Sequence, residues 1–452
     1  MRKLSLVIPA VAVVGSALFY ADIASSQTFN NTFRARDPGV RGGAAGAGLP
    51  LTGLTPKEID FFNSGKVDFE EVEEIDEGLG PTMNLDSCGG CHSQPATGGT
   101  SPAINPQIAF ATSRGMTNRI PSFLRANGPV REARFQKNSD GSPDGGVHAL
   151  FTISGSPAAP GCRLSQPDFE RQVTNRNISF RIPTPVFGAG LIEQVPDSTI
   201  LANRSANSDA KRAKGISGKA NRNGNDGTVS RFGWKAQNQS LLLFSGEAYN
   251  VEMGISNEIF QVERDQTTSC HFAQGPNDAQ NTEAAVVLDG VTAISKFAVF
   301  QRFLAPPSPS VTSPGGADSI GRGRDAFSNV GCALCHTPSL KTGNSTVPAL
   351  RNKTANLYSD LLVHDMGPGL ADGVSQGAAG GSEFRTAPLW GLGQRIFFLH
   401  DGRTDDLLEV IAAHRSGSSR DGNASEASQV VSDFNDMPER LKQDVLNFLR
   451  SL

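Results

Sequence analysis

The chain has 452 residues, of which 38 % are hydrophobic and 19 % charged, and its formal net charge is −4. This length suffices for two or more domains, and without a basic excess or a Lys/Arg run the composition argues against a nucleic-acid partner. The 49 glycines and 27 prolines, against 3 tyrosines and 2 tryptophans, predict much irregular backbone, as when loops wrap a prosthetic group.

The N-terminus has the pattern of a secretory leader. Arg2 and Lys3 precede an almost wholly apolar run from Leu4 to Tyr20, and the small residues Ala24–Ser26 follow. The run is shorter than the roughly 20 residues of a membrane span, so we expect a signal peptide over residues 1–26, although an uncleaved anchor is the alternative. No later segment is apolar enough to span a membrane. The mature protein is therefore expected to be periplasmic or secreted.

The first half of the mature chain is predicted to begin with a helix. Thr55–Glu58 combines a capping box with Pro at the first helical position, and the acidic segment to Glu77 is expected to continue that helix. Three short pieces then have the composition of strands, and a polar stretch has that of a surface loop. The strand candidates are Val147–Ser154, Ile178–Ile182 and Leu241–Phe244, and the loop candidate is Ser205–Gly227.

The second half follows the best linker in the chain, the Pro- and Ser-rich segment 306–316. A helix is predicted near Asp318–Val330 and another near Pro438–Leu452, where apolar residues recur at helical spacing. These residues are Leu441, Val445, Phe448, Leu449 and Leu452. We therefore predict an N-terminal domain over residues 27–305 and a C-terminal domain over 317–452.

Two Cys-x-x-Cys-His motifs carry the strongest chemical signal: Cys88-Gly-Gly-Cys91-His92 and Cys332-Ala-Leu-Cys335-His336. Two thiols at this spacing can add to the two vinyl groups of one porphyrin, and the His can ligate its iron. A Cys-x-x-Cys pair alone would also fit a zinc or dithiol redox site, but two motifs that each end in His, in a chain expected to be exported, disfavour both. The sequence thus predicts two covalently bound c-type haems. Of the six cysteines this leaves Cys162 and Cys270, which in an oxidising compartment are expected to form a disulfide, with two buried thiols as the alternative.

The sixth iron ligands decide whether each haem reacts or only carries electrons. After His92 no His occurs until His148, so the first haem is expected to have an open face. The second motif is followed by several candidates, which are His364 and Met366, then His400 and His414. We predict Met366 as the ligand, because it stands between Asp365 and a Gly-Pro-Gly sequence downstream of a haem motif. Met ligation would raise the potential and suit an electron relay; His364 and His400 remain alternatives.

Six segments, in this order along the chain, resemble the di-haem cytochrome c peroxidase and MauG-type superfamily, and most closely its di-haem oxidoreductases. They are Asn84–Pro95, Phe232–Gln237, Val251–Ile255, Leu357–Gly367, Glu383–Leu392 and Phe398–Arg403. The resemblance implies a mainly α fold of two cytochrome c-like haem domains with long irregular loops and a small β-containing insertion in the N-terminal half. Trp234 would relay electrons between the haems. Glu252 would move protons during peroxide cleavage.

Two departures from the peroxidases stand out. The position of their distal glutamine is best matched here by Phe244, an apolar residue that would make the pocket less able to bind and polarise peroxide and that leaves an oxygen-using reaction open. The removable distal His after the first motif is missing, as in the MauG type. Arg385 and His400–Arg403 resemble residues that support the C-terminal haem, with Arg385 a candidate partner for a haem propionate.

The function these features indicate is a periplasmic di-haem oxidoreductase, peroxidase-like, with a reactive N-terminal haem and an electron-relaying C-terminal haem. The alternatives are a plain electron-transfer cytochrome, for which His148 or His271 would have to reach the first haem, and a haem-dependent oxygenase or protein-modifying oxidase. The expected partners are a small electron-donor protein (a cytochrome or cupredoxin) and hydrogen peroxide or dioxygen. Calcium is a further candidate cofactor, although the sequence gives no site for it. The sequence leaves open the reducing substrate and the oligomeric state.

Overall fold

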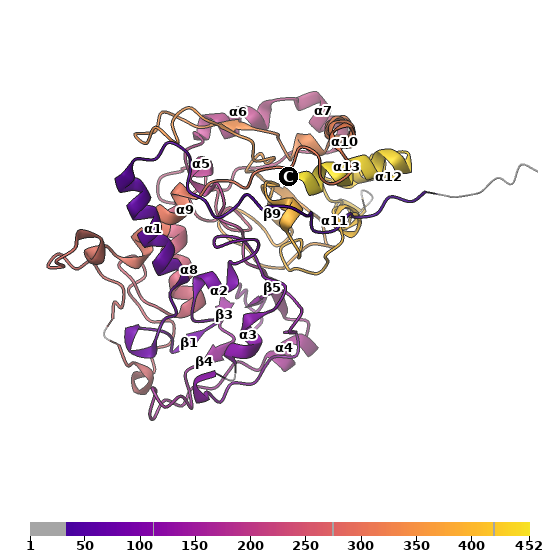
Figure 1. Ribbon diagram of the computed structural model, residues 1–452. Helices are drawn as coiled ribbons and strands as arrows, with labels where there is room; N and C mark the ends of the chain where they lie inside the picture. The colour runs from indigo at the N-terminus through magenta and orange to yellow at the C-terminus, as the bar shows by residue number, and fades with distance from the viewer. Residues whose placement is uncertain (1–32, 112, 274, 419–420) are drawn as a thin grey trace, which may run out of the picture. The chain divides into compact units, whose positions relative to one another are not determined.

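Small sheets and many short helices make up the fold (Figure 1). The computed structural model describes residues 33–111, 113–273, 275–418 and 421–452. Within them Arg34–Leu452 form one compact unit. The helices are α1 (Pro56–Glu70), α2 (Cys88–Cys91), α3 (Pro106–Phe110), α4 (Phe169–Thr174), α5 (Ala189–Glu193), α6 (Asp197–Ser205), α7 (Ser208–Lys214), α8 (Leu241–Met253), α9 (Ala293–Phe303), α10 (Ala317–Val330), α11 (Leu407–Ala413), α12 (Ser428–Asn435) and α13 (Glu439–Ser451). Short 3-10 turns occur at Ile75–Glu77, Ser113–Gly115, Thr268–Cys270, Val287–Gly290, Cys332–Leu334 and Leu392–Gln394.

The strands are short and pair only antiparallel. They are β1 (Thr82–Met83), β2 (Glu132–Phe135), β3 (Val147–His148), β4 (Phe151–Thr152), β5 (Ile178–Arg181), β6 (Leu340–Lys341), β7 (Thr354–Ala355), β8 (Val363–Asp365) and β9 (Glu383–Arg385). In the described part of the chain β3, β2 and β5 form a three-stranded sheet, and β1–β4, β6–β7 and β8–β9 form pairs. The fold is thus mixed, 33 % helical and 10 % strand, so more than half of it is irregular. The predicted irregular backbone and small β elements are confirmed, whereas the fold is mixed rather than mainly α, and the two cytochrome c-like haem domains stay a prediction.

Helices α1, α8 and α9 pack together in the N-terminal half (Figure 1). The predicted capping box of α1 is confirmed, because Thr55 accepts from the Glu58 backbone and the Glu58 carboxylate accepts from the Thr55 backbone. Gly65 lets α1 approach α9 closely, since a Cβ there would lie 2.3 Å from the Lys296 carbonyl oxygen. Aromatic rings fill the contact, with the centroids of Phe69 and Phe300 5.0 Å apart.

Three predicted elements in this half are wrong. Helix α1 ends at Glu70 instead of continuing to Glu77, because a run of carboxylates disfavours the negative end of a helix dipole. Leu241–Phe244 is the first turn of α8, started by the Ser240 side chain, which accepts from the Leu243 backbone. Part of the predicted surface loop Ser205–Gly227 is helix α7, ended by Gly215 at φ +76°. Strand β5 confirms the prediction for Ile178–Ile182, whereas Val147–Ser154 divides into β3 and β4, which pair with different strands.

Helices α10, α12 and α13 gather in the C-terminal half (Figure 1). Both helices predicted there are confirmed as α10 and α13. They touch backbone to backbone at Gly323, where a Cβ would lie 1.9 Å from the Asp444 carbonyl oxygen. The buried ion pair of Arg450 with Asp37 ties α13 to the start of the described chain.

The disulfide Cys162–Cys270 is present, as predicted. The predicted signal peptide lies outside the described residues. No helix in the described part of the chain has the length and apolar character needed to cross a membrane. The linker and domain boundaries at 306–316 stay predictions.

Candidate functional site

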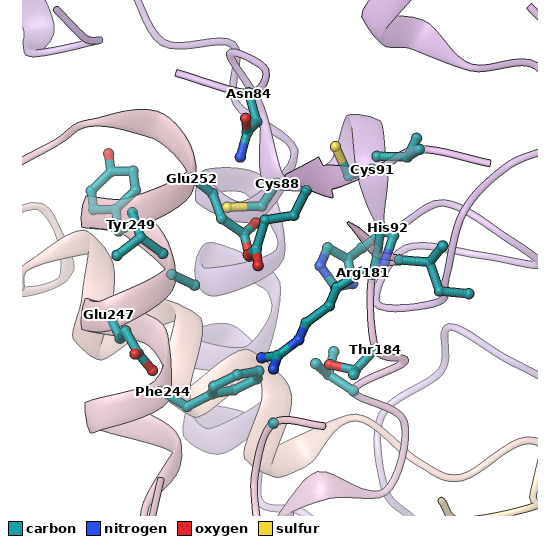
Figure 2. A pocket seen from close by; sticks show the side chains of 18 of the residues that line it. Asn84, Cys88, Cys91, His92, Arg181, Thr184, Phe244, Glu247, Tyr249 and Glu252 are labelled. Carbon is teal, nitrogen blue, oxygen red and sulfur yellow. The ribbon is translucent and has the colours of Figure 1, made fainter. Parts of the chain in front are cut away.

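The first Cys-x-x-Cys-His motif opens onto a hollow that we call the N-terminal cavity, which encloses about 1020 Å³, part of it open solvent (Figure 2). Helix α2 supplies the two cysteines, α8 forms another wall, and β2 and the end of β5 contribute charged side chains. Both Cys88 and Cys91 are free thiols. The two glycines between them are needed for packing, since a Cβ at Gly89 would lie 3.1 Å from the Glu70 Cα atom and one at Gly90 2.5 Å from a Leu85 methyl carbon.

His92 is oriented for metal ligation. Its Nδ1 lies 3.0 Å from the Gly99 carbonyl oxygen, which fixes the ring and assigns Nε2 to a metal. Burial lowers the pKa of His92 to about 4, opposed by the carbonyls of Gly99 and Thr184, so the ring is neutral at physiological pH. Among the described residues that line this cavity, His92 is the one His and none is a Met.

Glu252 is placed in the cavity by helix α8, on the same wall as Phe244 (Figure 2). Burial raises the pKa of Glu252 to about 8; the charges of Glu132 and Glu247 raise it further, and Arg134 opposes them. The carboxyl group therefore holds a proton at neutral pH, and it can lose that proton near pH 8. A group of this kind can both accept and return a proton.

Gln237 is a cavity residue that the sequence did not single out. It lines the same cavity as Phe244, and its buried Oε1 has no hydrogen-bond partner among the described residues. The amide packs over Gly233, whose φ of +82° and missing Cβ make room for it. The apolar face expected from Phe244 is thus only part of the wall. Gln237 stands at the end of the resembling segment Phe232–Gln237, which is the signal that could have pointed to it.

Trp234 lines both the N-terminal cavity and the cavity at the second motif. Its Nε1 donates to the Ile182 carbonyl oxygen at 3.0 Å, and its backbone carbonyl accepts from the Arg385 N–H at 2.9 Å. The indole is 9 % exposed, so it is held in a fixed wall between the two cavities.

Behind Trp234 lies a fully buried charge cluster. Asp372 pairs with Arg181 at 2.8 Å and with Lys235 at 3.0 Å. Lys235 also donates to the carbonyl oxygens of Gly380 and Glu383, and its ammonium lies 4.0 Å from the Phe384 ring centroid. Burial lowers the pKa of Lys235 to about 8, opposed by Asp372. This cluster joins three chain segments around the indole.

The second motif opens onto the C-terminal cavity, which encloses about 1450 Å³, part of it open solvent, and has mostly apolar walls. The thiols of Cys332 and Cys335 are free. Nδ1 of His336 lies 3.0 Å from the Tyr358 carbonyl oxygen, the same arrangement as His92 has with Gly99. Burial lowers the pKa of His336 to about 4, and the nearby imidazole of His414 adds to this.

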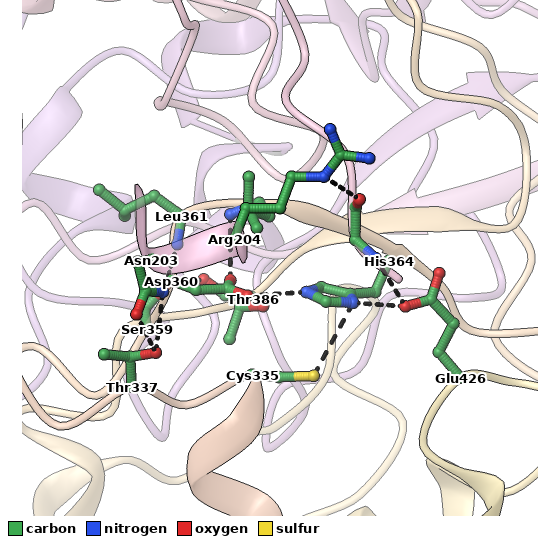
Figure 3. Close-up of polar contacts among 12 residues, drawn as sticks. Asn203, Arg204, Cys335, Thr337, Ser359, Asp360, Leu361, His364, Thr386 and Glu426 are labelled. Carbon is green, nitrogen blue, oxygen red and sulfur yellow. Dashed lines mark hydrogen bonds and ion pairs between the residues drawn. The ribbon is translucent and has the colours of Figure 1, made fainter. Parts of the chain in front are cut away.

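The candidates for the sixth ligand of the second iron differ in what their donor atoms contact. Figure 3 shows the His364 ring between two carboxylates, with Nε2 3.0 Å from Asp360 and Nδ1 2.7 Å from Glu426. Both nitrogens are therefore occupied, and Asp360 together with the Cys335 sulfur, 3.8 Å from Nδ1, raises the pKa of His364 well above its usual value against the effect of burial. This imidazolium has no lone pair for a metal.

The other candidates keep a donor atom available in the C-terminal cavity. Met366 lines the cavity and packs against the cluster that contains Trp234. His400 stacks on Phe384 with ring centroids 4.3 Å apart. His414 follows α11, and its Nδ1 lies 2.7 Å from the Val410 carbonyl oxygen, which repeats the geometry of His92 and His336.

Two arginines that line the C-terminal cavity lack an acid. Nε and Nη2 of Arg395 are buried without a partner, and Arg385 reaches the Gly233 carbonyl through Nε. Burial lowers the pKa of each to about 10, and for Arg385 the charge of Arg395 adds to this. Buried guanidinium groups without carboxylates fit a bound group that brings its own, as haem does with its propionates. Together with a free Cys pair and an oriented His at each cavity, the residues present fit two haems.

The two histidines that would have to ligate the first haem in a plain electron-transfer cytochrome lie outside the N-terminal cavity. His148 stacks on Phe135 at 3.7 Å and its Nε2 contacts Asp144. His271 Nε2 contacts the Asp265 carbonyl oxygen at 2.7 Å. Neither lines the N-terminal cavity. Among the described residues no group of three or more His, Cys, Asp or Glu side chains is arranged to hold a metal ion, and calcium stays a prediction.

The model of the family described as "Di-haem oxidoreductase, putative peroxidase" matches residues 163–452. The chain belongs to this di-haem oxidoreductase family. The family name implies haem cofactors and an oxidoreductase activity, which agrees with the resemblance seen in the sequence. The matched residues include the second haem motif but begin after the first, so the assignment of the first rests on the motif and its cavity.

Solved structures resemble this di-haem oxidoreductase only distantly. Hydrazine synthase from Kuenenia stuttgartiensis is 12 % identical with a TM-score of 0.34, over 99 % of this chain and 100 % of that chain. The diheme peroxidase BthA from Burkholderia thailandensis is 15 % identical with a TM-score of 0.28, over 49 % and 65 %. A MauG-like protein associated with microbial copper homeostasis is 18 % identical with a TM-score of 0.30, over 60 % and 90 %. No curated protein matches the sequence significantly.

Proposed function

We propose that this di-haem oxidoreductase is a periplasmic, peroxidase-like enzyme. Cys88, Cys91 and His92 would hold the haem that meets hydrogen peroxide, and a second haem would relay electrons. The observation that carries the proposal is the pairing, in one cavity, of a single oriented His with a carboxyl group that holds a proton at neutral pH. A haem bound there would supply an iron with an open face that can bind an oxidant and exchange electrons.

Glu252 would supply the proton transfers. Heterolytic cleavage of the O–O bond of peroxide takes a proton from one oxygen atom and delivers it to the other. Its pKa near 8 leaves Glu252 close enough to the working pH for both steps, because the group is mostly protonated near pH 7 while a minor fraction is ionised and can accept a proton. The Gln237 amide, which has an unpaired oxygen at the same cavity, would orient the hydrogens of the bound oxidant.

The second haem would be held by Cys332, Cys335 and His336, and we propose His414, in preference to the predicted Met366, as its sixth ligand. His414 has one ring nitrogen fixed by the Val410 carbonyl and the other left for a metal, as both motif histidines have. Met366 is partly buried and packs against an apolar cluster, which offers no comparable polar contact to orient a ligand atom. Ligands on both faces would leave this haem to transfer electrons without a substrate of its own.

Trp234 would connect the two haems, because it lines both cavities. The buried cluster of Asp372, Arg181 and Lys235 would hold the indole segment in position. Arg385 and Arg395 would pair with propionates on the same wall.

An exported location is supported by two features. The N-terminal leader pattern is one, and the Cys162–Cys270 disulfide is the other, since structural disulfides form in oxidising compartments. A small cytochrome or cupredoxin of the same compartment would then deliver electrons.

Electron paramagnetic resonance on the ferric, haem-loaded protein tests the proposal. We expect one high-spin and one low-spin haem, and loss of the high-spin signal after one equivalent of hydrogen peroxide. Two low-spin haems that do not respond to peroxide, even after partial reduction, would refute it and leave an electron carrier. A high-spin signal that responds to dioxygen after reduction, but not to peroxide, would instead support the oxygenase alternative, which Phe244 in the cavity wall favours.

A further inference from the structure

A buried tyrosine and a buried glutamate form a polar pair beside the N-terminal cavity that the proposed function does not use. The hydroxyl of Tyr249 donates to Oε1 of Glu73 at 2.5 Å. Tyr249 is 4 % exposed and Glu73 7 %. The residues are 176 apart in sequence, so the fold itself brings them together.

The carboxylate of Glu73 has no cationic partner in the described part of the chain. The charges that act on it are those of Glu71, Glu77 and Asp278, and all three are acidic. Burial, helped by these charges, raises the pKa of Glu73 to about 7, and the hydrogen bond from Tyr249 opposes the shift. A buried carboxylate without a counter-ion readily accepts a proton, because protonation removes an uncompensated charge.

The backbone fixes this acceptor in place. The Glu73 N–H donates to the Asp86 carbonyl oxygen at 2.8 Å, and the Glu73 carbonyl accepts from Arg114 at 3.1 Å. The Tyr249 ring meets Phe297 edge to face with centroids 5.1 Å apart. Neither side chain can turn away without losing buried contacts.

The two ends of the tyrosine face different surroundings. Its ring lines the N-terminal cavity together with Cys88, and it stands one helical turn before Glu252 and Met253 on α8. The Met253 sulfur lies 3.7 Å from the Cys88 sulfur, which confirms that this face of α8 covers the attachment site. Figure 2 shows the hydroxyl directed away from Glu252 and His92. The ring is thus next to the cavity while its proton points to Glu73.

A phenol gives up an electron at neutral pH only if its proton leaves at the same time, and a base within hydrogen-bond reach makes that possible. We propose that Tyr249 and Glu73 form a proton-coupled redox relay, in which Tyr249 donates one electron to the oxidised N-terminal haem site. The O–H bond of the phenol breaks and an O–H bond forms on Glu73, which leaves a neutral tyrosyl radical and a neutral carboxylic acid. A later electron from the external donor reduces the tyrosyl radical, and the proton moves back from the Glu73 carboxylic acid to the phenol oxygen, which restores the phenol and the carboxylate.

The relay rests on the proposed function only for its oxidant, hydrogen peroxide, which accepts two electrons and is reduced to water. Any one-electron oxidant that oxidises the haem site serves equally. The role of the Tyr249–Glu73 relay would be to store one oxidising equivalent at a defined residue until the electron donor arrives.

Freeze-quench electron paramagnetic resonance on the haem-loaded protein tests the relay. We expect an organic radical after one equivalent of peroxide, with hyperfine splittings that collapse in protein grown on ring-deuterated tyrosine. Tyr249→Phe should abolish this radical while the haem signals still respond to peroxide. Tyr358→Phe is the matched control, because Tyr358 is the other tyrosine of the described chain and makes no hydrogen bond to a carboxylate there.

Glu73→Gln separates a relay from a merely structural pair. It preserves the side-chain shape but removes the proton acceptor, so the radical yield should fall at least about tenfold. A tyrosyl radical that survives in Tyr249→Phe, or a yield that Glu73→Gln leaves unchanged, would overturn the proposal.

A second oxidant distinguishes failure of the relay from failure of the proposed function. If the haems ignore peroxide, photogenerated tris(bipyridine)ruthenium(III) oxidises the same protein by one electron. A radical at Tyr249 under that oxidant supports the relay in a protein that is not a peroxidase. If no radical forms at Tyr249 under either oxidant, the proposed relay is refuted.

Discussion

Replacing Glu252 by Gln removes a carboxyl group of the N-terminal cavity whose pKa is raised to about 8. The substitution keeps the size of the side chain, and the backbone carbonyl of Glu252 still accepts from Asn84 at 2.7 Å. Any loss therefore reflects the missing proton exchange. We expect the peroxide-dependent change of the high-spin haem to slow by about 10²–10⁴-fold, the usual contribution of a positioned acid or base.

The pH profile of the unsubstituted protein follows from the same carboxyl group. With a pKa of about 8, roughly one Glu252 in ten is ionised at pH 7, half at pH 8 and about nine in ten at pH 9. The step that begins peroxide cleavage needs the ionised form, because only a carboxylate can accept a proton. The rate should therefore rise about fivefold from pH 7 to pH 8, and less than about twofold from pH 8 to pH 9.

Stopped-flow absorbance of the Soret band under single-turnover conditions gives this rate directly, since it does not depend on the external electron donor. Glu252→Gln should be slow and nearly independent of pH. Glu247→Gln is the matched control, because Glu247 lines the same cavity and its charge raises the pKa of Glu252. It should keep the activity and shift the rise to lower pH. A Glu252→Gln protein with an unchanged rate, or a profile that Glu247→Gln leaves in place, would refute the reasoning.

Three further predictions concern the supporting structure. His414→Ala should convert the low-spin haem to high spin and change its reduction potential, whereas Met366→Ala should leave both unaltered; magnetic circular dichroism in the near infrared checks this, and the opposite result would assign Met366. Asp372→Asn leaves two buried cations facing each other, so urea titration should show a loss of about 3–5 kcal/mol, and a loss under 1 kcal/mol would contradict the buried cluster. Breaking the disulfide by Cys162→Ser with Cys270→Ser opens a loop of 108 residues, for which chain entropy gives about 4–5 kcal/mol; an unchanged urea midpoint would show that the denatured state is already compact.

Local sequence signals predicted the elements that depend on local chemistry. The capping box at Thr55 fixes where α1 begins, and the apolar spacing of α13 fixes its buried face, so both are visible without the fold. The end of α1 was mispredicted because the prediction omits the effect of the acidic run on the helix dipole. The start of α8 was mispredicted because the four apolar residues Leu241–Phe244 have the composition of a strand, although Ser240 before them is a helix cap. The signal for α8 was present in Ser240 and in Gly254, which ends the helix at φ +79°.

The haem motifs gave the attachment residues, but spacing alone could not rank the other ligands. His364 and His414 are both histidines downstream of the second motif. They differ in which acceptors surround the ring, because Asp360 and Glu426 occupy one and a helix carbonyl fixes the other. The residue that occupies Nδ1 of His364, Glu426, lies 62 positions further along the chain, so the difference between the two histidines is not visible in the local sequence. The pairing of Tyr249 with Glu73 is hidden from sequence for the same reason.

The two cavities differ in polarity in a way that suits different work. The N-terminal cavity is lined by three acids and three arginines, which are Glu132, Glu247, Glu252, Arg131, Arg134 and Arg181. The C-terminal cavity has mostly apolar walls, and Glu426, its one acid, is already paired with His364. Proton transfer needs ionisable groups within hydrogen-bond reach, whereas storing an electron requires little rearrangement and gains from a dry, fixed environment. A charge change in the N-terminal cavity can be compensated by proton exchange with neighbouring groups, whereas in the C-terminal cavity the charged groups besides the His364–Glu426 pair are Arg385 and Arg395, which keep their protons at neutral pH. We therefore expect protons to be exchanged almost entirely at the N-terminal cavity, while only electrons pass the wall that Trp234 forms between the two.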